Sequence, residues 1–87
     1  MPYIKHEQRV KLESLIQSFK DKMYMDPLSA GELNYIITQI SLAFLQNVSY
    51  TELNEVVGIL ECVKQEFYRR VVAEYEDEKI QENGDVY

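Results

Sequence analysis

Apolar residues in the first part of the chain follow the three-and-four spacing of one helical face. They are Leu12, Leu15, Ile16, Phe19 and Met23, and charged residues fall on the other side. The pattern predicts an amphipathic helix from about Lys5 to Met23. Asp26-Pro27 then predicts a turn, because a residue that precedes proline is disfavoured in the helical conformation.

A seven-residue phrase occurs twice and predicts the next two helix starts. Its copies are Leu28-Ser29-Ala30-Gly31-Glu32-Leu33-Asn34 and Val48-Ser49-Tyr50-Thr51-Glu52-Leu53-Asn54. In each copy the serine is placed to cap a free N–H of the first turn, and the glutamate is placed to reach back to it. The apolar residue before the serine is placed to pack on the leucine five positions later. We expect one helix from about Ala30 to Gln46 and another that opens at Ser49.

Both of these helices carry more apolar residues than one buried face requires. The second has one stripe of Leu33, Ile36, Ile37, Ile40, Ala43 and Phe44, with Tyr35, Leu42 and Leu45 on its other side. The third has no breaker before Asn83-Gly84, so it is expected to reach about 30 residues, or roughly 45 Å. Its first half, residues 56–63, is apolar almost all round.

These patterns predict an all-α, three-helix domain. The second helix and the third, which is the long C-terminal helix, are expected to form an antiparallel hairpin. The first helix is expected to pack across this hairpin. The surplus apolar faces predict a homodimer or a higher oligomer, because a three-helix monomer would leave a sizeable apolar patch exposed.

Composition agrees with a single small domain over residues 1–87. The chain has 87 residues, of which 46% are hydrophobic, and a domain of this size buries a modest core. One cysteine and the lack of a leader or long apolar run predict a reducing, cytoplasmic setting without a membrane segment.

The net charge of −6 is unevenly distributed. Residues 1–72 carry eight Lys and Arg against nine Asp and Glu, whereas the acidic extension 73–87 carries one lysine against six acids. Binding to nucleic acid or to an anionic membrane needs clustered positive charge. We therefore expect neither as a partner.

Several stretches of the chain are distinctive. They are Met1-Pro2-Tyr3-Ile4, Gly31-Glu32-Leu33-Asn34-Tyr35-Ile36-Ile37-Thr38, Glu66-Phe67-Tyr68-Arg69-Arg70-Val71-Val72, Tyr75-Glu76-Asp77-Glu78-Lys79-Ile80 and Glu82-Asn83-Gly84-Asp85-Val86-Tyr87. With them the chain resembles a family of short bacterial, archaeal and phage proteins classed as a domain of unknown function. The resemblance implies a prokaryotic or phage origin, and no activity, cofactor or site. Where it leads us to expect a proline after Ala73, this chain has Glu74, so the third helix need not break there.

Four acidic residues form a candidate metal site. Glu52-x-x-Glu55 is followed, after eighteen residues, by Glu74-x-x-Asp77. The spacing resembles that of the helical nucleoside triphosphate pyrophosphohydrolases of the MazG kind, which implies Mg²⁺ held for attack on a phosphate. In that family the two pairs lie on different helices, whereas here they fall on one expected helix, about 30 Å apart. Only an antiparallel dimer crossing near Lys64 would bring them together, and the alternative is that they are surface acids and a helix cap.

Lys64 is the first member of a candidate ligand-binding set. It falls within the apolar stripe of the third helix, which consists of Leu53, Val56, Val57, Leu60, Val63, Phe67, Val71 and Tyr75. A cation at this place suits an anion or a nucleotide in an oligomer cleft. The alternative is a lysine that extends past the core toward Glu61, one turn back.

Tyr68, Arg69 and Arg70 complete that set. They offer a stacking ring and two guanidinium groups to a phosphorylated or nucleotide ligand. The alternative is structural, because Glu66 lies three residues before Arg69 and four before Arg70, the spacing of ordinary surface ion pairs.

Other residues of interest have structural interpretations. Cys62 and His6 would have to meet in space to form a nucleophile–base pair, and Cys62 is instead expected in the core or at an interface. A zinc site is excluded because one chain offers too few Cys and His ligands. Asn34 and Asn54 are expected to fix helix register. The end, 85–87, is either a flexible acidic peptide or docks its two apolar residues on the subunit.

The leading interpretation is a non-enzymatic, oligomeric interaction module without a cofactor. It would bind a protein, or sequester a small anionic ligand, at a subunit interface. The alternative function is a Mg²⁺-dependent nucleoside triphosphate pyrophosphohydrolase that uses the four acids of the long helix. A third possibility is a purely structural assembly protein.

Overall fold

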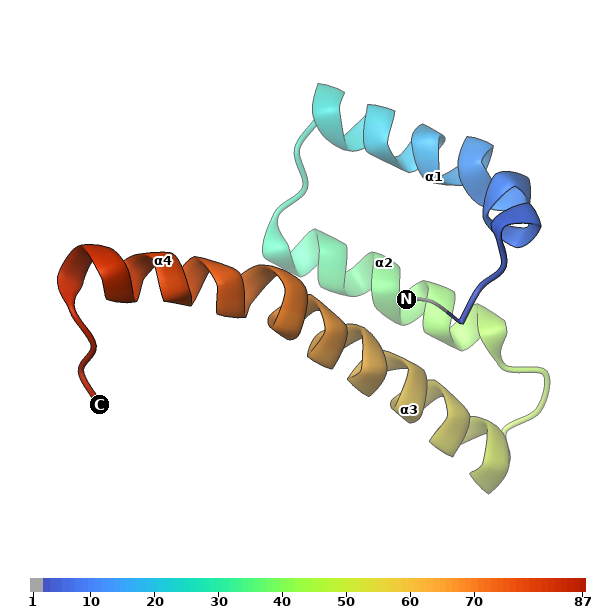
Figure 1. Ribbon diagram of the computed structural model, residues 1–87. Coiled ribbons are helices and arrows are strands. Elements are labelled where there is room, and N and C mark those ends of the chain that lie inside the picture. The colour runs from blue at the N-terminus through green and yellow to red at the C-terminus, as the bar shows by residue number, and fades with distance from the viewer. Residues whose placement is uncertain (1–2) are drawn as a thin grey trace. The chain divides into compact units, whose positions relative to one another are not determined.

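The computed structural model describes residues 3–87 and is helical over most of them, without a strand (Figure 1). The elements are α1 (His6–Met25), α2 (Ala30–Phe44), α3 (Tyr50–Phe67), a π-helical turn η1 (Tyr68–Val72) and α4 (Ala73–Asn83). The prediction of an all-α chain is confirmed. Met1 and Pro2 of the opening motif lie outside the described residues. The chain divides into two compact units, residues 1–43 and residues 44–87.

The first unit holds α1 and most of α2, and the chain reverses direction between them (Figure 1). At the start of α1, the Lys5 backbone N–H donates to Gln8 Oε1 at 2.8 Å. The helix ends at Met25, two residues later than predicted. Asp26 leaves the helical region at φ −143° and ψ 88°, as expected for a residue before proline.

The first copy of the repeated phrase forms the capping box that was predicted. The Glu32 N–H donates to Ser29 Oγ at 3.2 Å, and the Ser29 N–H donates to Glu32 Oε1 at 2.8 Å. Accepting the backbone N–H of Ser29 lowers the pKa of Glu32, because the bond favours the charged carboxylate. α2 therefore starts at Ala30, as expected.

The second copy, in the second unit, departs from that prediction. Ser49 does cap α3, since the Glu52 N–H donates to its Oγ at 3.3 Å. The Glu52 carboxylate, however, reaches past Ser49 and accepts the N–H groups of Gln46 at 3.0 Å and Asn47 at 2.7 Å. α2 ends at Phe44, two residues before the predicted end. The N–H groups of Gln46 and Asn47 therefore lie outside the helix, and they donate to the Glu52 carboxylate instead. Val48 is 83% exposed, so the expected packing on Leu53 is not made.

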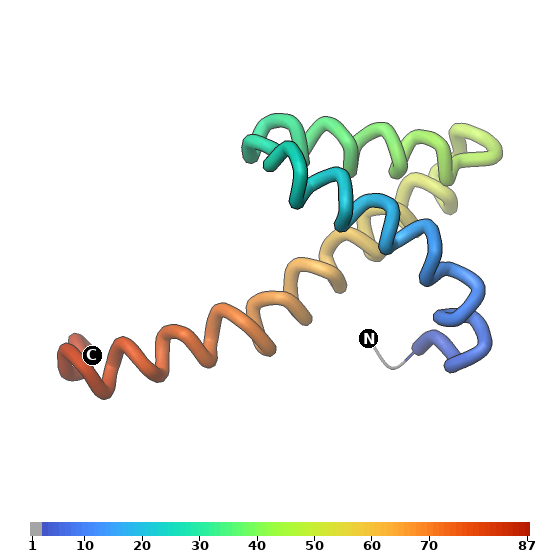
Figure 2. The backbone as a smooth tube through the Cα atoms, turned by 90° about the horizontal axis from the view of Figure 1, so that it is seen from above, coloured from blue at the N-terminus to red at the C-terminus, as the bar shows by residue number. Residues whose placement is uncertain are grey.

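The second unit is dominated by one continuous helical segment from Tyr50 to Asn83 (Figure 2). Phe67, Tyr68, Val72 and Ala73 all keep right-handed helical dihedral angles through the π turn. This confirms the long third helix and its passage through Glu74 without a break. The helix ends where predicted, at Gly84, whose φ of +83° favours glycine.

The π turn keeps the apolar stripe of this helix in line. The stripe advances by alternating steps of three and four residues from Leu53 to Phe67, and then by four to Val71 and four to Tyr75. In a straight α-helix, two steps of four would rotate Tyr75 about 80° away from Phe67. In η1 the Ala73 N–H bonds the Tyr68 carbonyl, five residues back. The extra residue removes about 100° of rotation and leaves Tyr75 about 20° from the line of Phe67.

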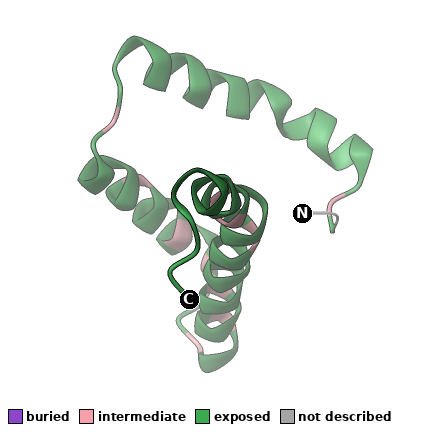
Figure 3. Ribbon diagram, turned by 60° about the vertical axis from the view of Figure 1, so that its left-hand side comes forward, coloured by how far each residue is buried: buried purple, intermediate pink, exposed green. Residues whose placement is uncertain are grey.

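None of the described residues is buried (Figure 3). Cys62 is exposed, so of the two places expected for it, a core or an interface, the core is excluded for the single chain. Within the second unit Val86 and Tyr87 are also fully exposed, so they do not dock on α4. None of the helices in residues 3–87 has the length and apolar character needed to cross a membrane.

Candidate functional site

The four candidate ligand-binding residues lie on and just before the π turn, and carboxylates of the same helix engage them. Lys64, on α3, forms an ion pair with Glu61 at 3.1 Å, and its side chain is 71% exposed. This contact confirms the alternative predicted from the sequence, in which Lys64 extends toward Glu61. The pKa of Glu61 lies below its ordinary value because it accepts hydrogen bonds from Gln65 and Lys64.

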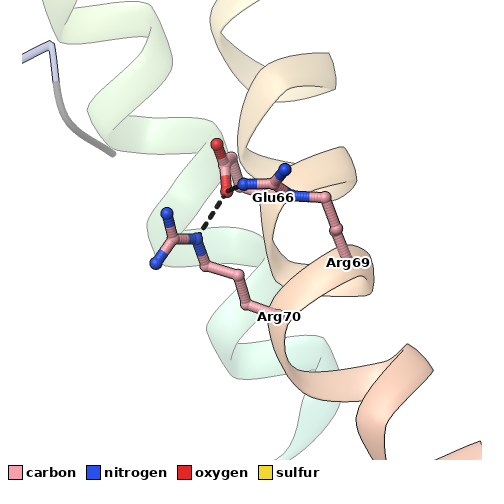
Figure 4. Close-up of polar contacts among 3 residues, drawn as sticks. All are labelled: Glu66, Arg69 and Arg70. Carbon is pink, nitrogen blue, oxygen red and sulfur yellow. Dashed lines mark hydrogen bonds and ion pairs between the residues drawn. The ribbon is translucent and has the colours of Figure 1, made fainter.

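Arg69 and Arg70 both turn toward Glu66 (Figure 4). Arg70 Nε donates to Glu66 Oε2 at 2.9 Å, and the Arg69 guanidinium lies 3.7 Å from the same oxygen. The hydrogen bond from Arg70 is the main reason that the pKa of Glu66 is lowered. Figure 4 also shows the terminal nitrogens of Arg70 turned away from Glu66, so this fork can reach a second acceptor.

Tyr68 bonds across the π turn. Its hydroxyl donates to Glu76 Oε1 at 2.8 Å, two turns further along. This hydrogen bond stabilises the protonated phenol and raises the pKa of Tyr68 above its ordinary value of 10.0. Residues eight apart meet here because the extra residue of η1 aligns them as positions seven apart align in an α-helix.

The four residues therefore do not form one anion-binding cradle within a single chain. Lys64 and Tyr68 lie along one side of the apolar stripe, whereas Arg70 lies on the other side with Glu66. Every member is at least half exposed in this chain. A ligand that used all of them would need groups from outside the chain to complete its site.

The four acids of the candidate metal site stay in two separate pairs. Glu52 and Glu55 lie on the first turns of α3, and Glu74 and Asp77 lie on α4 of the same continuous helix, about 30 Å away. Both carboxylate oxygens of Glu52 accept backbone N–H groups. In the described part of the chain no three His, Cys, Asp or Glu side chains gather in a way that could hold a metal ion.

One comparison with known proteins decides the family. The model described as Domain of unknown function (DUF6899) matches residues 1–86. The chain belongs to the DUF6899 family. The searches of curated proteins and of solved structures found no match. The DUF6899 assignment confirms the resemblance drawn from the sequence, and its description adds no activity, ligand or partner.

Sequence reasoning missed two features of this DUF6899 chain. The π turn has a signal in the sequence, namely the change from alternating steps of three and four to two steps of four after Phe67. The second feature is an open, largely apolar hollow in the first unit, at the end of α1 and the start of α2. It is lined mainly by Phe19, Met23, Met25, Leu28 and Ile36. Helical spacing alone does not reveal it, because the hollow depends on the turn at Asp26-Pro27.

Proposed function

We propose that this DUF6899 chain is a small helical interaction module that assembles with copies of itself. In the assembly, the interface would bind a protein partner or sequester a small anionic ligand. The observation that carries the proposal is the exposure of the apolar stripe on the long helix of the second unit. Leu60, Phe67 and Tyr75 expose 40%, 60% and 58% of their surface. Apolar stripes of this length mark interaction surfaces.

The lengths of the helices support self-association. The helix from Tyr50 to Asn83 is about 50 Å long, whereas α2, with 15 residues, is about 22 Å long. A helix as long as α2, packed along the long helix from its start at Tyr50, would reach only to about Lys64. The apolar side chains beyond Lys64, which include Phe67, Val71 and Tyr75, would then still lack a cover. A second copy supplies a helix long enough to provide one.

The ligand-binding part of the proposal draws on the charged groups beside the stripe. Lys64, Tyr68 and Arg70 lie along its two edges, close to the place where a second copy would pack. A second copy packed on the stripe would add its own charged groups to each edge. Guanidinium and ammonium groups gathered in this way suit a phosphorylated ligand or an acidic protein segment.

Sedimentation velocity and native mass spectrometry of the full chain test the proposal. The chain mass is 10.3 kDa, and we expect a multiple of it that dissociates on dilution. A mass of 10.3 kDa at every concentration would overturn the proposal. Release of pyrophosphate from nucleoside triphosphates in the presence of Mg²⁺ would overturn its non-enzymatic part and favour the four-carboxylate alternative.

A further inference from the structure

The stripe beyond Lys64 is a self-contained apolar surface. Phe67, Val71 and Tyr75 expose 60%, 52% and 58% of their surface, and Val72 lies beside them, half-buried. Because of the π turn, these side chains form one line along the helix instead of winding around it. A straight helix of matching pattern would pack along this line.

The charges beside this surface change sign along the helix. Residues 64–70 carry Lys64, Arg69 and Arg70 against Glu66, a net charge of +2, whereas residues 74–79 carry four acids against Lys79, a net charge of −3. In an antiparallel pair the basic stretch of one copy lies beside the acidic stretch of the other. In a parallel pair, like charges would meet along the whole length, and like charges that face each other disfavour association.

We propose that a second copy of this chain packs antiparallel on this surface, with the midpoint near Val72. The inference rests on the self-association proposed above and names its geometry. Positions that add up to about twice 72 then face each other. Arg70 and Glu74 lie on the same flank, so Arg70 of each copy comes beside Glu74 of the other, and Phe67 comes beside Tyr75. By two-fold symmetry each contact occurs twice.

The contacts of the single chain agree with this register. Arg70 uses its Nε toward Glu66 and turns its terminal nitrogens outward, where a second carboxylate would lie (Figure 4). Lys64 comes near Lys79 of the second copy, but Glu61 and Glu82 of their own chains hold these lysines at 3.1 and 3.0 Å. Glu66 comes near Glu78 and is already balanced by its two arginines.

The other antiparallel register, with the copies crossing near Lys64, fits the charges poorly. It brings Glu55 beside Glu74 and Glu52 beside Asp77, so that acids face acids at both ends. That register is the one the metal-dependent alternative requires. The register near Val72 keeps the four acids apart, so the two arrangements lead to different experimental outcomes.

Charge reversal at the two facing positions tests the register. We expect Arg70→Glu and Glu74→Arg, each alone, to weaken self-association at least about tenfold, because each places two like-charged pairs in the interface. A mixture of the two variants should form a heterodimer close to wild type in affinity, since both facing pairs then carry opposite charges. Intermolecular rescue separates this contact from effects within one helix. Native mass spectrometry of isotope-labelled full chains measures the distribution of dimers.

Asp77→Arg is the matched control, because it exchanges an acid for arginine three residues beyond Glu74, on the side of the helix opposite the stripe. It should leave the dissociation constant within about threefold of the wild-type value. Circular dichroism verifies that every variant keeps its helix. A wild-type oligomer whose Arg70→Glu and Glu74→Arg variants show no preference for each other overturns this inference and leaves the proposed function standing. A wild-type monomer at every concentration overturns both.

Discussion

At the scale of single residues, the two serine caps give a direct test of how the helices begin. Ser29 and Ser49 each accept a backbone N–H at the start of a helix. We expect Ser29→Ala and Ser49→Ala each to lower the free energy of unfolding by about 1 kcal/mol, because each leaves one N–H of the first turn without its acceptor. Urea denaturation followed by circular dichroism measures the change.

Ser14, in the middle of α1, provides the matched control for the caps. Ser14 lies inside the helix and caps neither end of it, and alanine is a good helix former. Ser14→Ala should therefore leave the free energy of unfolding unchanged or slightly higher. Equal effects of Ser14→Ala and Ser29→Ala would contradict the capping interpretation.

The ion pair between Glu66 and Arg70 predicts a pH dependence with a definite sign. The hydrogen bond from Arg70 lowers the pKa of Glu66 below 4.5. A carboxyl group with a lowered pKa in the folded state stabilises it above the unfolded value, and this contribution disappears as the pH falls through the lowered value. The wild type should therefore exceed Glu66→Gln in stability at pH 7, and the difference should vanish in acid. Urea denaturation at several pH values measures it.

A nuclear magnetic resonance titration of the Glu66 carboxyl provides the control. Removing the donor with Arg70→Gln should bring the pKa of Glu66 back toward 4.5. If that pKa stays lowered in Arg70→Gln, the hydrogen bond is not its cause.

At the scale of the element, the π turn makes a prediction opposite to that of a regular helix. The extra residue in η1 keeps Tyr75 in line with Phe67. Deleting Arg69 would convert the π turn into an α turn and leave every later side chain on the same face. We expect the deletion variant to stay helical and to keep its self-association, as measured by sedimentation velocity.

Insertion of one alanine after Arg69 is the matched opposite change. If the turn takes up no second extra residue, the insertion rotates everything beyond it by about 100° and removes Tyr75 from the stripe. Self-association should then weaken. Unchanged self-association in the insertion variant, or its loss on deletion of Arg69 with the helix intact, would contradict the role of η1 in aligning the stripe.

The sequence predicts the helices better than it predicts the turns that connect them. Proline, serine caps and Gly84 mark helix ends through local chemistry, and the structure places those ends within about two residues of the expectation. The carboxylate of Glu52 is different, since its partners depend on where α2 stops and how the next five residues turn. The sequence therefore predicted that Glu52 accepts backbone N–H groups near the start of α3, but not which ones, because the spacing of residues around Glu52 does not show how the preceding turn folds.

The candidate site shows the same division. The pairing of Glu66 with Arg69 and Arg70 follows from positions three and four apart, which meet on any α-helix. The bond from Tyr68 to Glu76 spans eight residues and exists because of the π turn. A stripe whose steps change from alternating three and four to successive fours indicates such a turn, so this part was present in the sequence as a pattern of spacing.

At the scale of the whole molecule, the apolar content and the burial lead to one consequence. The chain is 46% hydrophobic, yet none of its described residues is buried. Burial of apolar surface is the main favourable term in folding, so a chain that leaves these stripes exposed has little to offset its conformational entropy. The self-association proposed above would then contribute to the stability of the fold as well as to function.

Coupling of folding to assembly predicts that stability depends on protein concentration. For a dimer that unfolds to separate chains, a tenfold rise in concentration should add about 1.4 kcal/mol to the apparent free energy of unfolding. Phe67→Ala should weaken association by removing a large side chain from the stripe, so that a higher concentration is needed for the same urea midpoint. Val86→Ala, in the exposed tail, is the matched control and should behave as wild type. A wild-type urea midpoint that is the same over a hundredfold range of protein concentration would mean that the single chain is stable without a second copy. Its exposed stripes would then be contact surfaces for a different protein.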